Sequence, residues 1–169
     1  MNGRGWLMAV AGVGGVLFAA GAVDAVRMPV ALPVSGSHIA VNYDGFVKRG
    51  SVTLPLDQAG LFRSGDVVHW TITARNEGHT PVRPCVVVGS IARRGAYVPG
   101  SAYALNNAAV TYSLDGRFYS PQPTVPRIVG DFVVHAPAPP DTYKNVCFTW
   151  QKPIPAGHER SASYDMRIQ

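Results

Sequence analysis

Strict alternation of apolar and polar residues marks three segments of the chain, residues 67–74, 145–151 and 161–168. Side chains with a period of two belong to half-buried β-strands. The apolar faces consist of Val68, Trp70, Ile72 and Ala74 in the first segment, Val146, Phe148 and Trp150 in the second, and Ala162, Tyr164, Met166 and Ile168 in the third. Because both tryptophans lie on such faces, we expect them in the core rather than on a sugar-stacking surface.

Shorter strand-like runs separated by turn residues fill the rest of the chain. These runs cover residues 38–42, 46–48, 51–54, 85–90, 96–98, 110–114 and 128–135. Asp44-Gly45 and Asp115-Gly116 predict hairpins, whereas Gly130-Asp131 predicts a bulge or a turn inside the last run. Past residue 25, no stretch keeps apolar residues at helical spacing for three turns, and 14 prolines and 18 glycines are scattered along the chain. The pattern predicts an all-β sandwich with Greek-key connections and about seven to nine strands.

The first 25 residues have the order of a secretory signal peptide. Arg4 precedes an uncharged run over residues 5–23, and a small-residue triplet ends at Ala25. An uncleaved membrane anchor is the alternative, because the run approaches the roughly 17 to 25 residues that span a bilayer. Its glycines and the cleavage-like triplet favour removal. We therefore expect an exported chain, periplasmic, cell-surface or extracellular, with no stable membrane span after cleavage.

Residues 26–37 read as an extended tether or an edge strand. Apolar residues alternate here, but Pro29 and Pro33 cannot donate to a strand ladder. An alternative is that this segment adds to the sheet edge of a neighbouring molecule and so builds a surface filament. The remainder, residues 38–169, has the size of one β-sandwich domain.

Four motifs in a fixed order suggest a family for residues 38–169. They are Gly65-Asp66 with the turn Asn76-Glu77-Gly78; the valines 86–88 with the phrase from Tyr97 to Ala102; the run from Val110 to Gly116; and Tyr143 and Trp150 with the turn 153–157 and the last alternating strand. With these motifs the chain resembles a single copy of the conserved repeat domain of bacterial surface proteins, domain of unknown function 11. The resemblance implies an immunoglobulin-like sandwich with a structural or adhesive role in the cell envelope.

The net charge of +5 indicates weak attraction to acidic partners, or dispersed charges that keep the domain soluble. Arg93 and Arg94 lie beside Tyr97 and Tyr103 in the sequence, and we expect these four exposed residues to form any surface that binds an acidic glycan or another envelope component. There is no basic block and no aromatic-interleaved basic stripe. The sequence thus predicts no nucleic-acid binding.

Cys85 and Cys147 are the two cysteines of the chain. An oxidising compartment favours a disulfide between them. If they lie on antiparallel neighbours, however, the strand register separates them beyond bridging distance, and a pair of small buried thiols is the alternative. Their spacing does not fit a zinc site, which takes ligands two to four residues apart.

The sequence offers no recognisable catalytic constellation. The histidines are His38, His69, His79, His135 and His158, and no two have metal-ligand spacing. A nucleophile elbow, a phosphate-binding loop and an HExxH helix are all missing from the sequence. We expect no enzyme, no metal and no cofactor, although distant residues could converge on an unrecognised hydrolase site. The leading prediction is a secreted structural or adhesive module whose partner is an envelope or extracellular protein or glycan, or a second copy of itself.

Overall fold

The structure, a computed structural model, describes residues 38–169. This range is all-β: it contains eleven strands, two short 3₁₀ turns and no α-helix. The strands are β1 (Ile39–Arg49), β2 (Val52–Pro55), β3 (Val67–Asn76), β4 (Cys85–Ser90), β5 (Gly95–Tyr97), β6 (Tyr103–Ala104), β7 (Ala109–Ser113), β8 (Thr124–Val129), β9 (Phe132–Pro137), β10 (Asn145–Trp150) and β11 (Glu159–Ile168). The 3₁₀ turns are η1 (Leu56–Gln58) and η2 (Pro140–Thr142).

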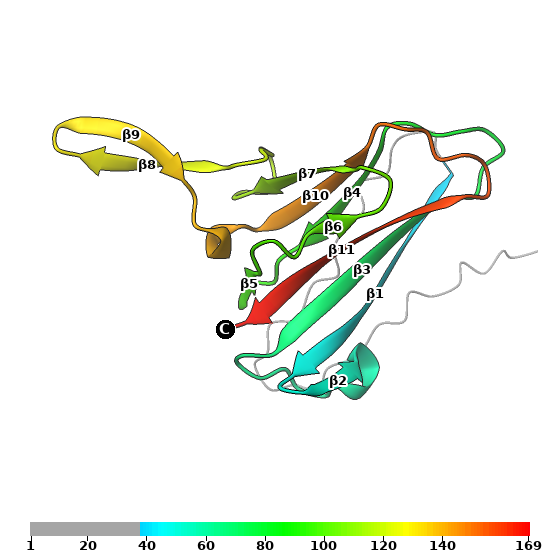
Figure 1. The fold of residues 1–169 in the computed structure, drawn as a ribbon, viewed down its shortest axis with the longest axis horizontal. Helices are drawn as coiled ribbons and strands as arrows, with labels where there is room; N and C mark the ends of the chain where they lie inside the picture. Colours follow the sequence, from blue (N-terminus) through cyan, green and yellow to red (C-terminus); the bar gives the residue numbers. More distant parts are fainter. Residues whose placement is uncertain (1–37) are drawn as a thin grey trace, which may run out of the picture.

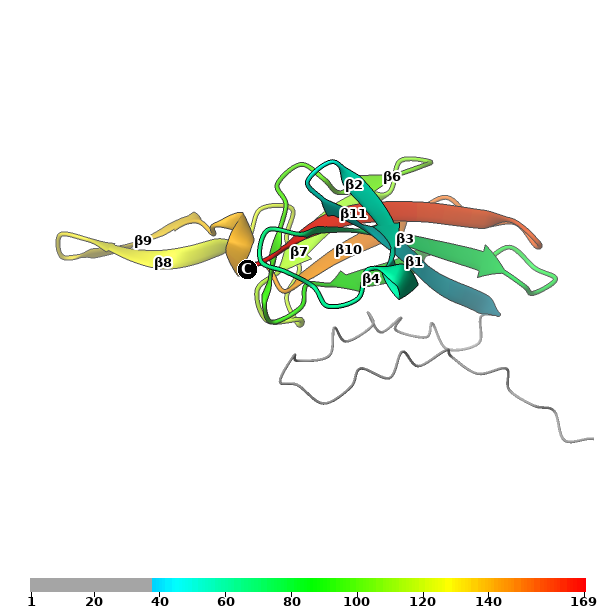
Figure 2. The same ribbon diagram turned by 90° about the horizontal axis from the view of Figure 1, so that it is seen from below.

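The strands pair antiparallel in sheets of unequal size (Figure 1). In the larger sheet the order is β2-β1-β3-β11-β5, and β6 also pairs with β11. The smaller sheet has the order β4-β10-β7. Strands β8 and β9 form a separate two-stranded sheet, which extends away from the other two in both Figure 1 and Figure 2.

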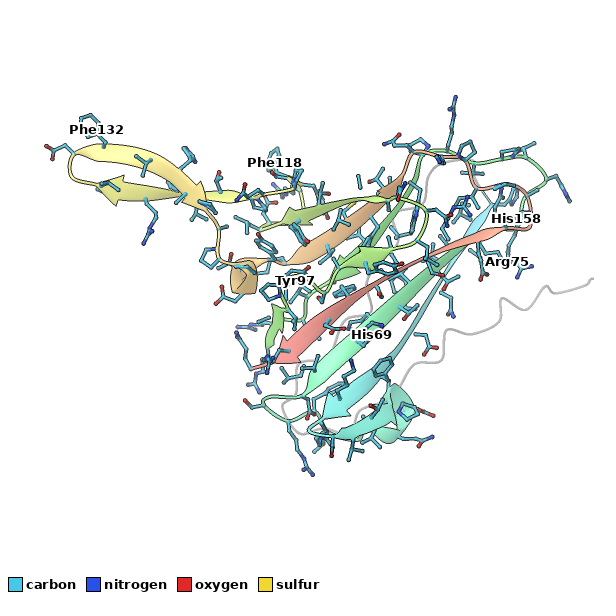
Figure 3. The ribbon with its side chains drawn as sticks, viewed as in Figure 1. His69, Arg75, Tyr97, Phe118, Phe132 and His158 are labelled. Atoms are coloured by element: carbon cyan, nitrogen blue, oxygen red, sulfur yellow. The ribbon has the colours of Figure 1, made fainter. Side chains whose placement is uncertain are left out.

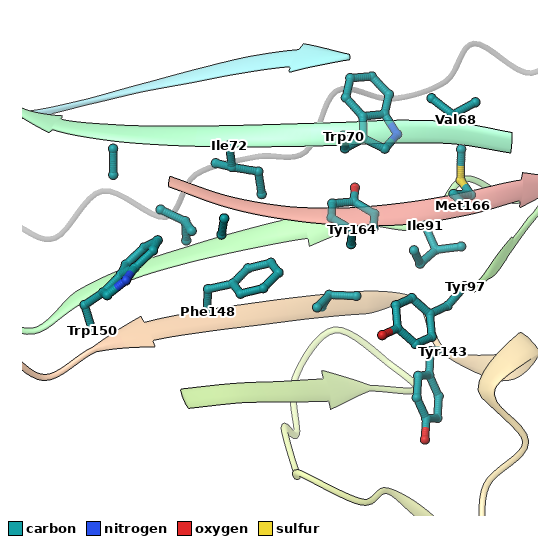
Figure 4. Packing of buried hydrophobic residues seen from close by; sticks show 14 of the residues in the cluster. Val68, Trp70, Ile72, Ile91, Tyr97, Tyr143, Phe148, Trp150, Tyr164 and Met166 are labelled. Atoms are coloured by element: carbon teal, nitrogen blue, oxygen red, sulfur yellow. The ribbon is translucent and has the colours of Figure 1, made fainter. Parts of the chain in front are cut away.

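One hydrophobic core lies between the larger and the smaller sheet (Figure 4). The larger sheet contributes Val47, Val68, Trp70, Ile72, Ala74, Ala162, Tyr164 and Met166, and the smaller sheet contributes Val87, Val146, Phe148 and Trp150. These positions confirm the three apolar faces expected from the alternation, with Ile168 half-buried at the end of the last one. The alternation predicts these strands correctly because each of them buries one face in the core.

Two tyrosines join the sheets across this core. The Tyr164 hydroxyl donates to the carbonyl of Ser90 at 2.8 Å, and the Tyr43 hydroxyl donates to the carbonyl of Val88 at 3.4 Å. Burial raises the pKa of Tyr43 to about 12. The Tyr164 ring packs so closely on Gly89 that a Cβ there would overlap the ring. The smaller sheet therefore approaches the larger one at a position that only glycine allows.

The structure corrects one of the turn predictions and confirms another. The predicted hairpin at Asp44-Gly45 is wrong, because β1 runs through it without interruption. A Cβ at Gly45 would lie 2.6 Å from the carbonyl oxygen of His69, so this glycine permits close approach of β3 and not a turn. Gly130-Asp131, in contrast, is a turn, and the single run 128–135 is divided between β8 and β9.

The predictions for residues 1–37 lie outside the described residues. They comprise the signal peptide at 1–25, the tether at 26–37 and strand exchange by that tether.

Candidate interaction surfaces

The hairpin of β8 and β9, residues 124–137, is the first candidate surface, and we call it the arm. Its base is closed by a hydrogen bond from the amide of Ala138 to the carbonyl of Pro123 at 2.8 Å, and both of these residues are buried. Beyond this base nearly every arm residue is exposed on both faces of the hairpin. The tip carries large apolar side chains, with Ile128 82% and Phe132 75% exposed.

Both faces of the hairpin carry apolar side chains at the tip of the arm. Directly opposite partners share a face, so Ile128 and Val133 lie on one side while Val129 and Phe132 lie on the other. Figure 3 shows Phe132 at the far end of the arm, remote from the core. Exposed apolar groups that gather in one place usually mark an interaction surface. The arm therefore has the character of a binding element rather than of a connecting loop.

A second candidate surface is basic and lies where β11 ends. Five exposed cations gather there, Lys48, Arg63, Arg93, Arg94 and Arg167, and we call them the basic end. The register brings Lys48 and Arg167 to either side of Val67. Backbone hydrogen bonds join the other segments to this point, from Gln169 to Arg94 and from Gly65 to Ile168.

One carboxylate within the basic end is already engaged. The buried side chain of Asp66 accepts hydrogen bonds from Arg49 Nε at 2.9 Å and Nη2 at 2.7 Å. The backbone amide of Arg63 donates to the same carboxylate at 2.9 Å. The Arg49 guanidinium, with this amide, holds the pKa of Asp66 below its usual range despite the opposing effect of burial. Asp66 is therefore committed to Arg49, and the five cations of the basic end surround an internal ion pair.

The four residues expected to form a glycan surface do not form one. Arg93 and Arg94 are exposed on the turn before β5. Tyr103 is 62% exposed, but it pairs with Ser163 of β11, whereas Gly95, next to the two arginines, pairs with Ile168. Five residues along β11 place Tyr103 about 16 Å from this turn. The expectation that Tyr97 is exposed is wrong, since its side chain is only 4% exposed.

Tyr97 is buried because it belongs to an aromatic cluster at one end of the core (Figure 4). Its ring lies 5.2 Å from that of Tyr112 and 5.8 Å from that of Tyr143, measured between centroids. The hydroxyls of Tyr97 and Tyr112 are 3.2 Å apart, and the amide of Ala102 donates to Tyr97. Burial, followed by the hydrogen bond to Tyr97, raises the pKa of Tyr112. The cluster joins β5, β7 and the segment after η2, so it closes the core.

His69 and Asp165 form a polar pair on the outer face of the larger sheet. His69 Nδ1 lies 2.5 Å from Asp165 Oδ1, and the imidazole stacks on the Phe46 ring at 4.7 Å. Such a pair orients an imidazole, but acyl-transfer catalysis also needs a nucleophile and an oxyanion site. Within residues 38–169, no group of three acidic, histidine or cysteine side chains is placed to hold a metal ion. On the sheet surface, Asp165 therefore serves to orient the imidazole of His69.

The two cysteines lie on neighbouring antiparallel strands. Cys85 opposes Trp150 and Cys147 opposes Val88, so three register positions separate them along the pair. Cys147 is a buried free thiol. A disulfide between them would require a shift of this register, because three positions span about 10 Å.

No family model, no curated protein and no solved structure matches this chain. Among residues 38–169, none of the helical segments has the length and apolar character needed to traverse a bilayer.

Proposed function

We propose that this chain is a secreted or cell-envelope module without catalytic activity, which acts in structure or adhesion through its exposed surfaces. The observation that carries the proposal is the arm, an apolar projection that holds five of the ten large hydrophobic side chains exposed among residues 38–169. The arm lines no described hollow, and only Val125 at its base packs against the core. An adhesive module needs an accessible apolar element of this kind.

We further propose that residues 38–169 form an immunoglobulin-like Greek-key sandwich related to domain of unknown function 11. The chain crosses between the two sheets more than once, for example from β3 to β4 and again from β10 to β11. The motif residues also have physical roles that support the likeness. Asp66 binds Arg49, and the side chain of Asn76 donates to the carbonyls of Thr80 and Ile154 while accepting from the amide of Gly78.

Export and envelope association are tested on the full chain in a bacterial host. We expect the chain to appear in the envelope or the medium as a polypeptide that begins at Val26, measured by intact mass. The purified product should then co-sediment with isolated envelope fragments. Ile128→Ser should weaken this association, whereas Leu61→Ser, a change at another exposed aliphatic position outside the arm, should leave it unchanged. A full-length chain that stays in the cytoplasm would contradict the proposal.

The basic end favours a second function, the binding of an acidic glycan. Five cations within one end give a local positive field that attracts polyanions and weakens with salt. We expect retention on an immobilised acidic polysaccharide that falls as salt rises and is lost in the double variant Arg93→Glu, Arg94→Glu. The matched control is Arg117→Glu, Lys152→Glu, which changes the net charge equally elsewhere on the surface. Equal loss in both doubles, or no salt dependence, would reject a specific basic site.

A further inference from the structure

The arm exposes more apolar surface than is usual for a stable hairpin in water. A free two-stranded sheet is marginally stable by itself, because it buries neither face. Here both faces of the tip are apolar and exposed, and within the described residues neither outer edge pairs with another strand. The arm therefore has the properties of an element that is completed by a partner.

The register shows which backbone groups the arm offers to that partner. Antiparallel pairs alternate between hydrogen-bonded and non-hydrogen-bonded pairs. Pro126 opposes His135 and has no N–H, so this pair is non-hydrogen-bonded. The neighbouring pair of Arg127 and Val134 is then hydrogen-bonded within the hairpin. The alternation turns the amides of Val133 and His135 outward on β9, whereas β8 turns outward only those of Thr124 and Ile128.

The two edges of the arm differ because of proline. On β8 the outward row reads Thr124, Pro126 and Ile128, so its central donor is missing. Proline at such a position protects an edge against strand addition. On β9 the outward row begins with Val133 and His135, two successive complete pairs of donor and acceptor, and ends at Pro137. One edge is blocked and the other is open over two residues.

We propose that the open edge of β9 pairs antiparallel with β9 of a second copy of this chain. The outward amides set the register: Val133 opposes His135 of the other copy and Val134 opposes its own counterpart on the two-fold axis. This arrangement closes a ring of hydrogen bonds that uses all four outward N–H groups, as an isologous interface requires. The inference rests on the proposed function, since it names the partner of the arm.

The same register gives the apolar tip a place to pack. With Val134 on the two-fold axis, Phe132 lies opposite Ala136 of the second copy, which is at the base of that arm. One face then carries the row Val129, Phe132, Ala136 and Val125, the last two from the second copy, and all four are apolar. The outward backbone amides and the row of apolar side chains thus indicate the same register, although the two observations concern different residues.

A lipid surface fits the arm less well than a second copy. Asp131 lies at the apex of the hairpin and is exposed, so insertion into hydrocarbon would bury a carboxylate first. In the paired arms Asp131 stays at the margin of the ribbon and remains hydrated. Because pairing engages only five residues from each copy, 132–136, we expect a weak dimer that forms at high local concentration.

The test compares two matched proline variants of the full chain by sedimentation over a concentration series. Val133 and Ile128 oppose each other, are both β-branched, and both have outward amides. We expect the unchanged chain to dimerise, Val133→Pro to weaken the dimer at least ~tenfold, and Ile128→Pro to leave it intact. Circular dichroism confirms that the body of each variant is folded, since neither position contributes to the core.

The register is tested by cross-linking in a background with Cys85→Ser and Cys147→Ala. Val134→Cys should form a disulfide between copies, because non-hydrogen-bonded partners have Cα atoms about 4.5 Å apart. Thr124→Cys, on the blocked edge, should not. A monomer at the highest soluble concentration, equal effects of the two prolines, or cross-linking at Thr124 alone would overturn the pairing. Envelope association that persists in a monomeric Val133→Pro variant would leave the proposed function standing, whereas a dimer without envelope association would reject that function alone.

Discussion

Two buried tryptophans differ in one hydrogen bond. The indole N–H of Trp150 donates to the carbonyl of Leu105 at 2.8 Å, whereas the indole N–H of Trp70 is buried and has no partner among the described residues. An unpaired buried donor already costs stability in the native protein, so removing it adds no cost from a lost hydrogen bond. Trp70 and Trp150 are therefore both buried, but only Trp150 stabilises the protein through a hydrogen bond of its indole.

We expect Trp150→Phe to lower the free energy of unfolding by about 1–2 kcal/mol more than Trp70→Phe. Both substitutions remove the same volume from the core, so the comparison isolates the hydrogen bond. Only Trp150→Phe leaves a carbonyl without its donor. Denaturant titration of both variants measures the difference, and equal losses would show that the bond to Leu105 contributes nothing.

Asp66 should make the stability of the protein depend on acid pH. Its pKa is lowered in the folded state by Arg49, so its contribution is complete above the unfolded pKa of about 3.9. That contribution is lost as the pH falls through the folded value. Thermal melts from neutral to strongly acid pH should therefore show a smaller acid loss in Asp66→Asn than in the unchanged chain, together with lower stability at neutral pH. Parallel curves would contradict this role.

At the scale of elements, the arm is separable from the body. The hydrogen bond between Ala138 and Pro123 already brings the two ends of the arm together. We expect replacement of residues 126–135 by Asn-Gly, which keeps the core contact of Val125, to change the free energy of unfolding of the body by less than about 0.5 kcal/mol. Differential scanning calorimetry under dilute, monomeric conditions measures this, and a large loss would show that the arm supports the core.

The sequence predicts elements well where one face must be buried. Residues 67–74 and 145–151 were placed correctly because their alternation reflects the core itself. Asp44-Gly45 misled the prediction, since glycine serves close packing as well as turns and the local sequence does not distinguish the two. The sequence does not predict that the arm is exposed, because Ile128 and Phe132 are apolar and an apolar residue in a strand is ordinarily taken as buried.

The candidate surfaces could be predicted only in part. Arg93 and Arg94 are exposed as expected, but Lys48, Arg63 and Arg167 join them only through the order of β1, β3, β11 and β5. Tyr97 was assigned to this surface by its nearness in sequence. Along a strand, neighbours in sequence point to opposite faces, so such nearness does not establish a shared surface.

At the scale of the whole molecule, the two sheets should unfold together. Trp70 lies in the larger sheet and Trp150 in the smaller one, and both contribute to a single core. With Trp6→Phe as background, the fluorescence of Trp70→Phe reports on Trp150 and that of Trp150→Phe reports on Trp70. In each variant we expect the fluorescence midpoint to coincide with that of far-ultraviolet circular dichroism. Separate midpoints would show that the sheets are independent units.

The central place of β11 governs when the protein can fold during synthesis. β11 pairs with β3 on one side and with β5 and β6 on the other, so residues 159–168 complete a sheet whose other strands are translated earlier. Until the ribosome releases them, the apolar face of β3 has no finished core to enter. The nascent chain therefore stays open to chaperones and proteases until residues 159–168 have left the ribosome. A premature stop codon before β11 would yield a substrate for degradation rather than a shortened domain.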